Sequence, residues 1–466
     1  MTAASRDQLD PLIWKITAVA VLGSLLAQLD ATIVNVSLSG LAHDLHATLP
    51  SIQWVTSGYL LALTLVLPLN GWLIDRIGGR ALYLWCFASF TLSSLLCGRA
   101  WSANALIGFR LLQGASGGLL APMAQLMIKR AAGNQFTRVA GYATVPILLG
   151  PLLGPVIAGA ILHYASWRWL FLVNLPVGVL ALVLSALVLP DDREERQPRE
   201  LDWLGLVLLS PGLALMLVGA ERVRQHAGLV AMLAGVVLLV VFLRVEARKA
   251  ERALIDLGQF RNPTFTVAAI AQFLSNGVTF AGQMLIPLFL IEACGRSPAE
   301  MGWLLAPLGL GMMAAFPPLG FLTGRFGGRA VATCGALLSL TATVLLAWLA
   351  TRPLLVAALV PALFVRGVGL GATTLPAISA AYASVEPRTL PMAATTLNVL
   401  QRLGGPTLTT LCALVLTGLL GAHVLTIGLN AWATTFLLLA VLHAVMVVTV
   451  VRLPGRMASQ SDERSR

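Results

Sequence analysis

One carboxylate and one guanidinium lie inside long apolar stretches of this chain and could together handle a proton. Asp30 lies in the run L-L-A-Q-L-D-A-T-I-V-N-V within residues 14–39, a stretch long enough to cross a bilayer. An acid at that depth costs ~2.5–3.5 kcal/mol on insertion scales, so it usually marks an ion or proton pathway. Arg110, in the apolar stretch 103–127, is predicted to lie in the same half of the membrane as Asp30 and to pair with it, directly or through water.

The Asp30–Arg110 pair has two interpretations. A nearby cation favours the charged form of a carboxylate, whereas burial favours the neutral form. Moving water or substrate between the two groups would change which effect dominates, and Asp30 would then carry a proton. The alternative is a fixed ion pair with a structural role only.

Other polar side chains in apolar stretches recur at helical spacing. The series 272, 276, 279 and 283 follows i, i+4, i+7 and i+11, which places four polar residues on one helix face. Amides in lipid need partners, so this face is predicted to line a cavity or to contact another helix. Residues 395, 398 and 402 repeat the pattern. The candidate substrate-cavity residues are Gln113, Gln272, Asn276, Thr279, Gln283, Arg366, Asn398 and Arg402.

The composition indicates a protein with many membrane spans. Of 466 residues, 58% are hydrophobic and 11% are charged, against about 25% charged in an average soluble protein. Mean hydropathy is +0.85. Spans in lipid must be helical to satisfy their backbones. Fourteen spans are predicted, at residues 14–39, 53–73, 82–98, 103–127, 139–163, 168–189, 203–220, 227–243, 264–291, 301–322, 331–350, 354–380, 393–420 and 429–451.

The distribution of basic residues predicts the orientation. With the N-terminus inside, 22 Lys and Arg fall in cytoplasmic segments and 6 outside, which matches the positive-inside rule. Both termini are therefore predicted to be cytoplasmic. The net charge of +11 is explained by these loops, so no nucleic-acid partner is inferred.

The chain is predicted to consist of two six-helix halves with an inserted pair of helices. The segment G-W-L-I-D-R-I-G-G-R (71–80) returns as G-F-L-T-G-R-F-G-G-R (320–329). Each half also has an arginine followed by glycines in its fourth helix, Arg110 and Arg366. Repeated halves are typical of secondary transporters, which bind substrate at the interface of the repeats near the membrane midplane. The predicted parts are 1–190, an inserted hairpin with its linkers at 191–262, and 263–466.

Two glycine-containing motifs suggest how the helices could move and pack. In the first, Asp75 is predicted near a helix start, where the helix dipole favours an anion, and pairing it with basic groups would hold the cytoplasmic face closed. The members of this gating loop are Gly71, Asp75, Arg76, Gly78 and Arg80. The second motif allows close helix packing with a bend. Its members are Gly150, Gly154, Pro155 and Gly159.

These motifs resemble those of the major facilitator superfamily, in its fourteen-helix drug:proton antiporter (DHA2) branch. The resemblance lies in four stretches that follow one another in the order expected: Leu29–Asn35, the 71–80 loop, Arg110 with Gln113 and Gly114, and Gly150–Gly159. The run S-W-R-W-L-F-L-V-N-L-P-V-G (166–178) is similar to multidrug exporters of the MdtD-like subgroup. The sequence departs from these motifs at three positions. Gly79 stands where the loop motif usually has a basic residue, Ala158 replaces a Gly, and Gly324 replaces the Asp in the second copy of the loop.

The resemblance implies an all-α integral membrane protein with the major-facilitator fold, in a bacterial inner membrane. It implies a monomeric proton-coupled exporter of small organic molecules that works by alternating access in the lipid bilayer, with protons and substrate as its partners. The three arginines within spans, against one Asp, favour an alternative, a proton-coupled exporter of an endogenous organic anion or metabolite rather than of drugs. A second alternative is a transporter-like sensor or a membrane enzyme, for which no catalytic constellation is found.

Several chemistries have no support in the sequence. It contains no C-x-x-C and no G-x-x-x-x-G-K-[ST]. The pair His43 and His46 has no further ligands nearby, so no metal site and no cofactor are predicted.

Overall fold

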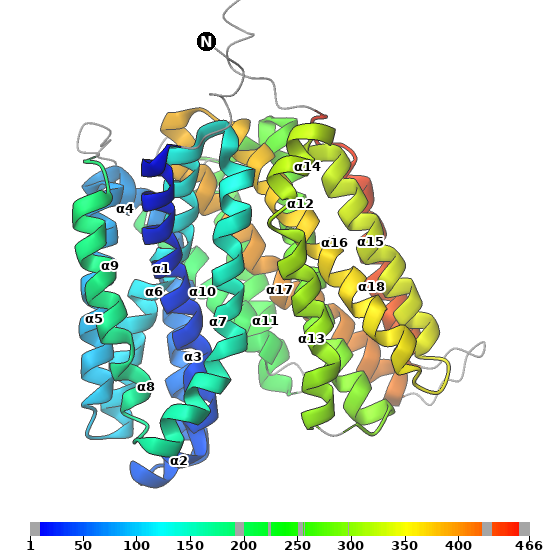
Figure 1. The fold of residues 1–466 in the computed structure, drawn as a ribbon, viewed down its shortest axis with the longest axis horizontal. Coiled ribbons are helices and arrows are strands. Elements are labelled where there is room, and N and C mark those ends of the chain that lie inside the picture. The colour runs from blue at the N-terminus through cyan, green and yellow to red at the C-terminus, as the bar shows by residue number, and fades with distance from the viewer. Residues whose placement is uncertain are drawn as a thin grey trace, which may run out of the picture. The chain divides into compact units, whose positions relative to one another are not determined.

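The computed structural model describes residues 10–191, 200–221, 225–249, 255, 257–296, 298–421 and 431–455, and every regular element in those ranges is a helix (Figure 1). The chain divides into two compact units, Met1–Ser210 and Pro211–Arg466. The division falls inside one helix, α10 (Trp203–Glu221), in the region predicted to be an inserted hairpin.

Unit 1 is organised around α1, which packs against α6, α7 and α9, while α3 packs along α6 (Figure 1). Its α-helices are α1 (Pro11–Ile33), α2 (Leu38–Asp44), α3 (Leu49–Val66), α4 (Asn70–Ile77), α5 (Gly79–Gly98), α6 (Ala103–Ala132), α7 (Phe136–Tyr164), α8 (Trp169–Leu172), α9 (Asn174–Val188) and the start of α10. Short 3-10 turns follow α1 (Val34–Ser37), α3 (Leu67–Leu69) and α6 (Gly133–Gln135).

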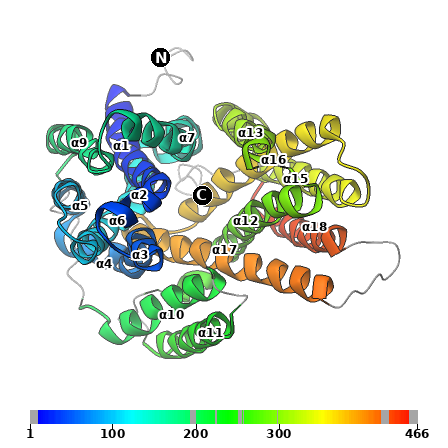
Figure 2. The same ribbon diagram turned by 90° about the horizontal axis from the view of Figure 1, so that it is seen from below.

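Unit 2 is organised around α16, which packs against α12, α13 and α15, and α12 packs in turn against α17 and α18. Its helices are the rest of α10, α11 (His226–Glu246), η7 (Leu257–Arg261), α12 (Pro263–Leu288), η8 (Phe289–Ala293), α13 (Pro298–Ala315), α14 (Leu319–Phe326), α15 (Gly328–Leu349), α16 (Val356–Ala383), η9 (Pro387–Thr389), α17 (Leu390–Gly421) and α18 (Ala431–Val450). Figure 2 shows α10 beside α11, where Gly235 approaches the carbonyl oxygen of Gly212.

The membrane-span count by length and composition is lower than the fourteen predicted. Eleven runs among the described residues qualify, or twelve if the bent pair α13 and α14 is one span. The difference has two visible causes. Residues 103–147 form one continuous apolar run, in which α6 continues into α7, and the apolar part of α10 (Trp203–Gly219) is short. The fourteen-span count therefore stays a prediction.

The helices α1 and α12 begin with the same local design. Asp10 caps α1 by accepting a hydrogen bond from the Leu12 amide (2.8 Å), and Asn262 caps α12 by accepting one from the Thr264 amide (2.9 Å). Each cap is followed by proline at the first helical position, where no backbone donor is needed. With Pro11 aligned to Pro263, Asp30 in α1 corresponds to Gly282 in α12.

Glycines bring backbones into direct contact in each unit. A Cβ at Gly118 of α6 would lie 2.6 Å from the Leu63 carbonyl oxygen of α3, and one at Gly114 would collide with the Tyr59 backbone. In unit 2, a Cβ at Gly367 of α16 would collide with the backbone of α13. Only glycine allows this approach, so these helix pairs are packed backbone to backbone.

Candidate functional site

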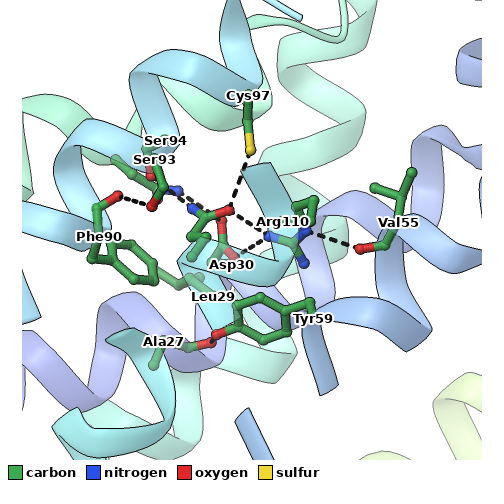
Figure 3. Close-up of polar contacts among 12 residues, drawn as sticks. Ala27, Leu29, Asp30, Val55, Tyr59, Phe90, Ser93, Ser94, Cys97 and Arg110 are labelled. Carbon is green, nitrogen blue, oxygen red and sulfur yellow. Dashed lines mark hydrogen bonds and ion pairs between the residues drawn. The ribbon is translucent and has the colours of Figure 1, made fainter. Parts of the chain in front are cut away.

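Asp30 lies at the centre of a buried polar network in unit 1 (Figure 3). The residue is 0% exposed, and its Oδ2 forms an ion pair with Nη1 of Arg110, which is also 0% exposed. Its other oxygen, Oδ1, accepts hydrogen bonds from Gln113 Nε2 (3.0 Å) and Asn174 Nδ2 (2.8 Å). The pair expected from the sequence is therefore formed directly, and α1, α6 and α9 each contribute a group to it.

The Arg110 guanidinium is held on several sides. Its Nη1 also donates to Gln113 Oε1 (2.8 Å), and its Nε donates to the Val55 carbonyl of α3 (3.0 Å). The guanidinium carbon lies 4.1 Å from the centre of the Tyr59 ring, a cation–π contact, and the Tyr59 hydroxyl donates to the Ala27 carbonyl of α1 (3.1 Å; Figure 3). These contacts fix the position of the cation opposite Asp30.

Gln113 uses both ends of its amide inside this network. Besides Asp30, its Nε2 donates to Ser94 Oγ (2.7 Å), and its Oε1 accepts from Arg110 and, weakly, from the Cys97 thiol (3.7 Å). The side chain is fully buried. The sequence assigned Gln113 to a substrate cavity, but the structure places it as a partner of the ion pair, because its whole hydrogen-bonding capacity is taken up there.

Asn174 was missed as a site residue by the sequence argument. It is the first residue of α9, and it is held there by the buried residues Trp167, Leu170 and Phe171, which precede it in the run 166–178 and join the hydrophobic core of unit 1. The available signal was an isolated amide in an apolar span, since such a group needs a polar partner. Its partner lies 144 positions away in sequence, so the sequence could not name it.

The polar stripe of α12 runs from a buried end to an exposed end. Gln272 is buried and donates to the Thr374 carbonyl of α16 (2.8 Å). Asn276 is half-buried against Gly405 of α17, and Thr279 donates to a carbonyl of its own helix. Gln283 is exposed. The shared face is therefore a helix contact at its first residue and an open surface at its last.

Accessibility along the stripe is expected to follow this gradient. In a cysteine-free background, Gln283→Cys should react with a membrane-impermeant thiol reagent and Gln272→Cys should not, because the side chain at 283 is exposed and the one at 272 is buried. The measurement is the rate of labelling in intact membranes. Cysteines at 273 and 274 serve as controls on the neighbouring faces, and labelling there as fast as at 283 would contradict the assignment of a wet face.

The remaining cavity candidates differ in environment. Asn398 of α17 is half-buried and donates to the Ala394 carbonyl of its own helix (2.8 Å), and Arg402 is exposed. Arg366 of α16 is 0% exposed and donates from Nη2 to the Val278 carbonyl of α12 (2.9 Å). These residues belong to unit 2, whereas the Asp30 network lies within unit 1.

The 71–80 loop turns at Gly78, and its acid does not lie where the sequence argument placed it. Gly78 has φ 88° and ends α4, and Gly327 repeats this with φ 85° in the second half. Asp75 lies half-buried in the last turn of α4, not at the start of α5, so the dipole argument made from the sequence does not apply to it. Arg76 is exposed over the Trp72 ring, while Arg80 donates to the Ala186 carbonyl of α9 (2.6 Å). Gly71 is buried in α4.

The second glycine-containing motif, Gly150 to Gly159, lies in α7, which packs against α1 just beside Asp30. A Cβ at Gly150 would lie 3.1 Å from Cβ of Gln28, and one at Gly154 would collide with the Thr32 side chain. Gly159 faces open space, and the side chain of Pro155 is outside the part that the structure describes. The first two glycines thus bring α7 onto the segment of α1 that carries the carboxylate.

Comparison with known proteins decides the family. A model described as Major Facilitator Superfamily matches residues 20–406 and 268–465. The chain belongs to the major facilitator superfamily. This is a family of transporters, not of enzymes, so the helices described above are those of a multi-span membrane transporter.

Two relatives are drug-resistance proteins by name. The multidrug resistance protein B homolog of Mycobacterium tuberculosis (strain ATCC 25618 / H37Rv) is 34% identical over 419 residues, 88% of this chain and 77% of that protein. The protein named "Putative multidrug resistance protein MdtD" of Escherichia coli (strain K12) is 33% identical over 361 residues, 74% of this chain and 75% of that protein. The resemblance to the MdtD-like subgroup found in the sequence is thereby confirmed.

Solved structures of the superfamily share the fold. The human organic anion transporter MFSD10 (TETRAN) has a TM-score of 0.66 at 18% identity and covers 95% of this chain and 100% of that chain. The proton:xylose symporter XylE has a TM-score of 0.64 at 15% identity, with 97% and 99% covered. These likenesses confirm the major-facilitator architecture of the chain.

Proposed function

We propose that this transporter is a proton-coupled exporter of small organic molecules, a drug:proton antiporter of the DHA2 branch that works by alternating access. The observation that carries the proposal is the buried Asp30–Arg110 pair. A carboxylate that is wholly removed from water and is bonded to a cation and two amide donors can change its protonation only when its surroundings change.

The chemistry of coupling follows from the bonds that a proton would disrupt. As a carboxylate, Asp30 accepts from Arg110, Gln113 and Asn174 on its two oxygens. A proton on either oxygen replaces an acceptor by a donor and removes the charge that attracts the guanidinium. Protonation would therefore loosen α1 from α6 and α9, and reformation of the bonds would expel the proton. Alternating access would use this cycle to exchange protons for substrate.

The direct test is transport by the purified protein in proteoliposomes. Ethidium, an organic cation, and benzoate, an organic anion, serve as probe substrates with and without an imposed pH gradient. We expect gradient-dependent movement of ethidium. Movement of benzoate alone would favour the second candidate function, export of an organic anion, for which the specific observation is the buried Arg366 in α16. Movement of neither probe under any gradient would argue against both.

The same proposal includes the arrangement of the chain in a bacterial inner membrane. We propose fourteen spans, with the three parts 1–190, 191–262 and 263–466, a monomer in the lipid bilayer, and protons and the exported small molecule as partners. The support is the excess of Lys and Arg in alternate connections and the agreement between the predicted spans and the helices that the structure describes.

Topology is tested by reporter fusions. Fusions placed after Arg466 and within 191–202 are expected to read as cytoplasmic, because the basic segments favour that side. Alkaline phosphatase and green fluorescent protein at the same sites give opposite signals and control for expression. An external signal at either site would contradict the fourteen-span arrangement.

The loop motif leads to a kinetic prediction. Asp75→Asn is expected to slow maximal transport by roughly tenfold or more and to leave apparent substrate affinity within about twofold, since the residue lies outside the Asp30 network and would act on the rate of opening. The measurement is initial flux against substrate concentration. Asp10→Asn, which keeps a capping side chain on α1, is the matched control. Wild-type flux in Asp75→Asn would contradict the gating role and would mean that the loop only helps to set the membrane topology.

A further inference from the structure

Arg366 is a buried cation whose charge nothing in its own unit is seen to balance. The side chain is 0% exposed. Nη2 donates to the Val278 carbonyl, but Nε and Nη1 have no hydrogen-bond partner among the described residues. A buried ionic group is normally paired and fully hydrogen-bonded, because its desolvation is otherwise uncompensated. Arg366 in this conformation is therefore an incomplete site.

The corresponding arginine of unit 1 shows what is missing. Arg110 faces Asp30 of α1, and the two charges balance each other. Arg366 faces Gly282 of α12, the residue that corresponds to Asp30 when the two capped helix starts are aligned. A Cβ at Gly282 would lie 2.7 Å from the guanidinium carbon, so the two groups are in contact. In unit 2, the arginine of the pair is therefore present as Arg366, but the position that corresponds to Asp30 is a glycine.

Among the residues that the structure describes, no carboxylate is seen beside Arg366. The six apolar stretches from 264–291 to 429–451 contain no Asp or Glu. The polar side chains considered on neighbouring helices, His443 and Ser339, carry no negative charge. His443 of α18 is buried, with Nδ1 2.8 Å from the Leu439 carbonyl and Nε2 without a partner, and it adds positive charge when protonated. Ser339 of α15 bonds the Arg366 carbonyl (3.4 Å), not its guanidinium.

We infer that Arg366 is the receptor of an anion-binding site in unit 2, completed by a small monoanion from outside the chain. A carboxylate or a halide has the required charge, and the free Nε and Nη1 are the donors that would bind it. Two sources share this chemistry, a carboxylate group of a transported compound and a resident inorganic ion. The inference is independent of proton coupling at Asp30, because binding at this site needs no gradient and no transport.

The test is ligand-induced stabilisation of the purified protein in detergent. Chloride and benzoate are titrated separately, with sodium isethionate keeping the ionic strength constant. We expect a saturable rise in Tm on the order of a few degrees in the wild type. Arg366→Gln should abolish the rise, and Arg366→Lys should reduce it by keeping the charge without the planar fork.

A gain of carboxylate supplies the decisive control. Gly282→Asp places an acid where unit 1 has Asp30, and it should pair with Arg366 and remove the response to added anion. Gly282→Asn has the same size without the charge and should keep the response. The displaced guanidinium is the end of a flexible side chain, which can shift to admit either residue.

The outcomes distinguish the sources and can overturn the site. A benzoate response at concentrations where chloride gives none would assign the site to carboxylate compounds, and a chloride response of equal or higher affinity would assign it to a resident ion. An unchanged response in Arg366→Gln, or in Gly282→Asp, would overturn the inference. Failure of proton-driven ethidium transport would leave these binding results unaffected, so the two proposals fail separately.

Discussion

Asp30→Asn is expected to abolish transport driven by a pH gradient while keeping substrate binding and downhill exchange. Asparagine has nearly the size of aspartate and keeps one acceptor oxygen, which can replace either the Oδ2 bonded by Arg110 or the Oδ1 bonded by Asn174, but it cannot titrate. We expect gradient-driven flux to fall at least ~100-fold, to the background of empty liposomes, by analogy with the 10²–10⁴-fold that a positioned acid–base group typically contributes to a reaction rate.

The measurement is flux into and out of proteoliposomes with the gradient imposed, reversed or absent. Asp30→Glu should retain partial function, because it keeps the titratable group and displaces it by one methylene. Asp10→Asn, on the same helix but outside the network, should behave as wild type. Full gradient-driven transport by Asp30→Asn would mean that another group, such as a histidine or an acid near a helix end, carries the proton.

Arg110→Gln is expected to be the most destabilising single change in unit 1. It leaves the Asp30 carboxylate buried without its cation and removes the bond to the Val55 carbonyl. Loss of one member of a buried ion pair typically costs 3–5 kcal/mol, so we expect a large fall in folded yield and in Tm. Asp30→Asn combined with Arg110→Gln should recover part of the loss, because the uncompensated charge is gone.

The cycle of the two single changes and the double change is measured by thermal unfolding in detergent. Arg80→Gln is the matched control, since Arg80 also donates to a backbone carbonyl of another helix but lies outside the buried pair. A double variant no more stable than Arg110→Gln alone would show that the ion pair contributes little and that packing around Tyr59 is what the arginine supports.

The pair itself could be predicted from the sequence because both members are charged residues in apolar spans, and such groups must find each other or water. The rest of the network could not. Ser94, Cys97 and Asn174 are ordinary small or polar residues whose role depends on how α5 packs against α6 and how α9 packs against α1. The partners of Gln113, Asp30 and Ser94, could not be named from the sequence either, because a helical pattern does not reveal what covers a side chain.

The span count shows a similar limit. Hydropathy identifies apolar residues but not where a helix bends or continues. At Phe316-Pro317-Pro318 two prolines interrupt the helix hydrogen bonds, and α13 and α14 meet at a bend of 56°. The family model and the solved relatives confirm the major-facilitator fold, while the number of helices that cross the membrane remains a prediction.

The glycine contacts of α6 with α3 and of α16 with α13 have a mechanical consequence. Helices that touch through their backbones have no side chains between them to change rotamer, so each pair can neither slide nor separate by small steps. Each pair is therefore expected to move as one rigid body. Motion within a unit is then expected to be taken up by contacts made through longer side chains and by two glycine turns, Gly78 between α4 and α5 and Gly327 between α14 and α15. A larger side chain between two such helices, as in Gly114→Leu, is therefore expected to block the motion of the pair as well as to destabilise the fold.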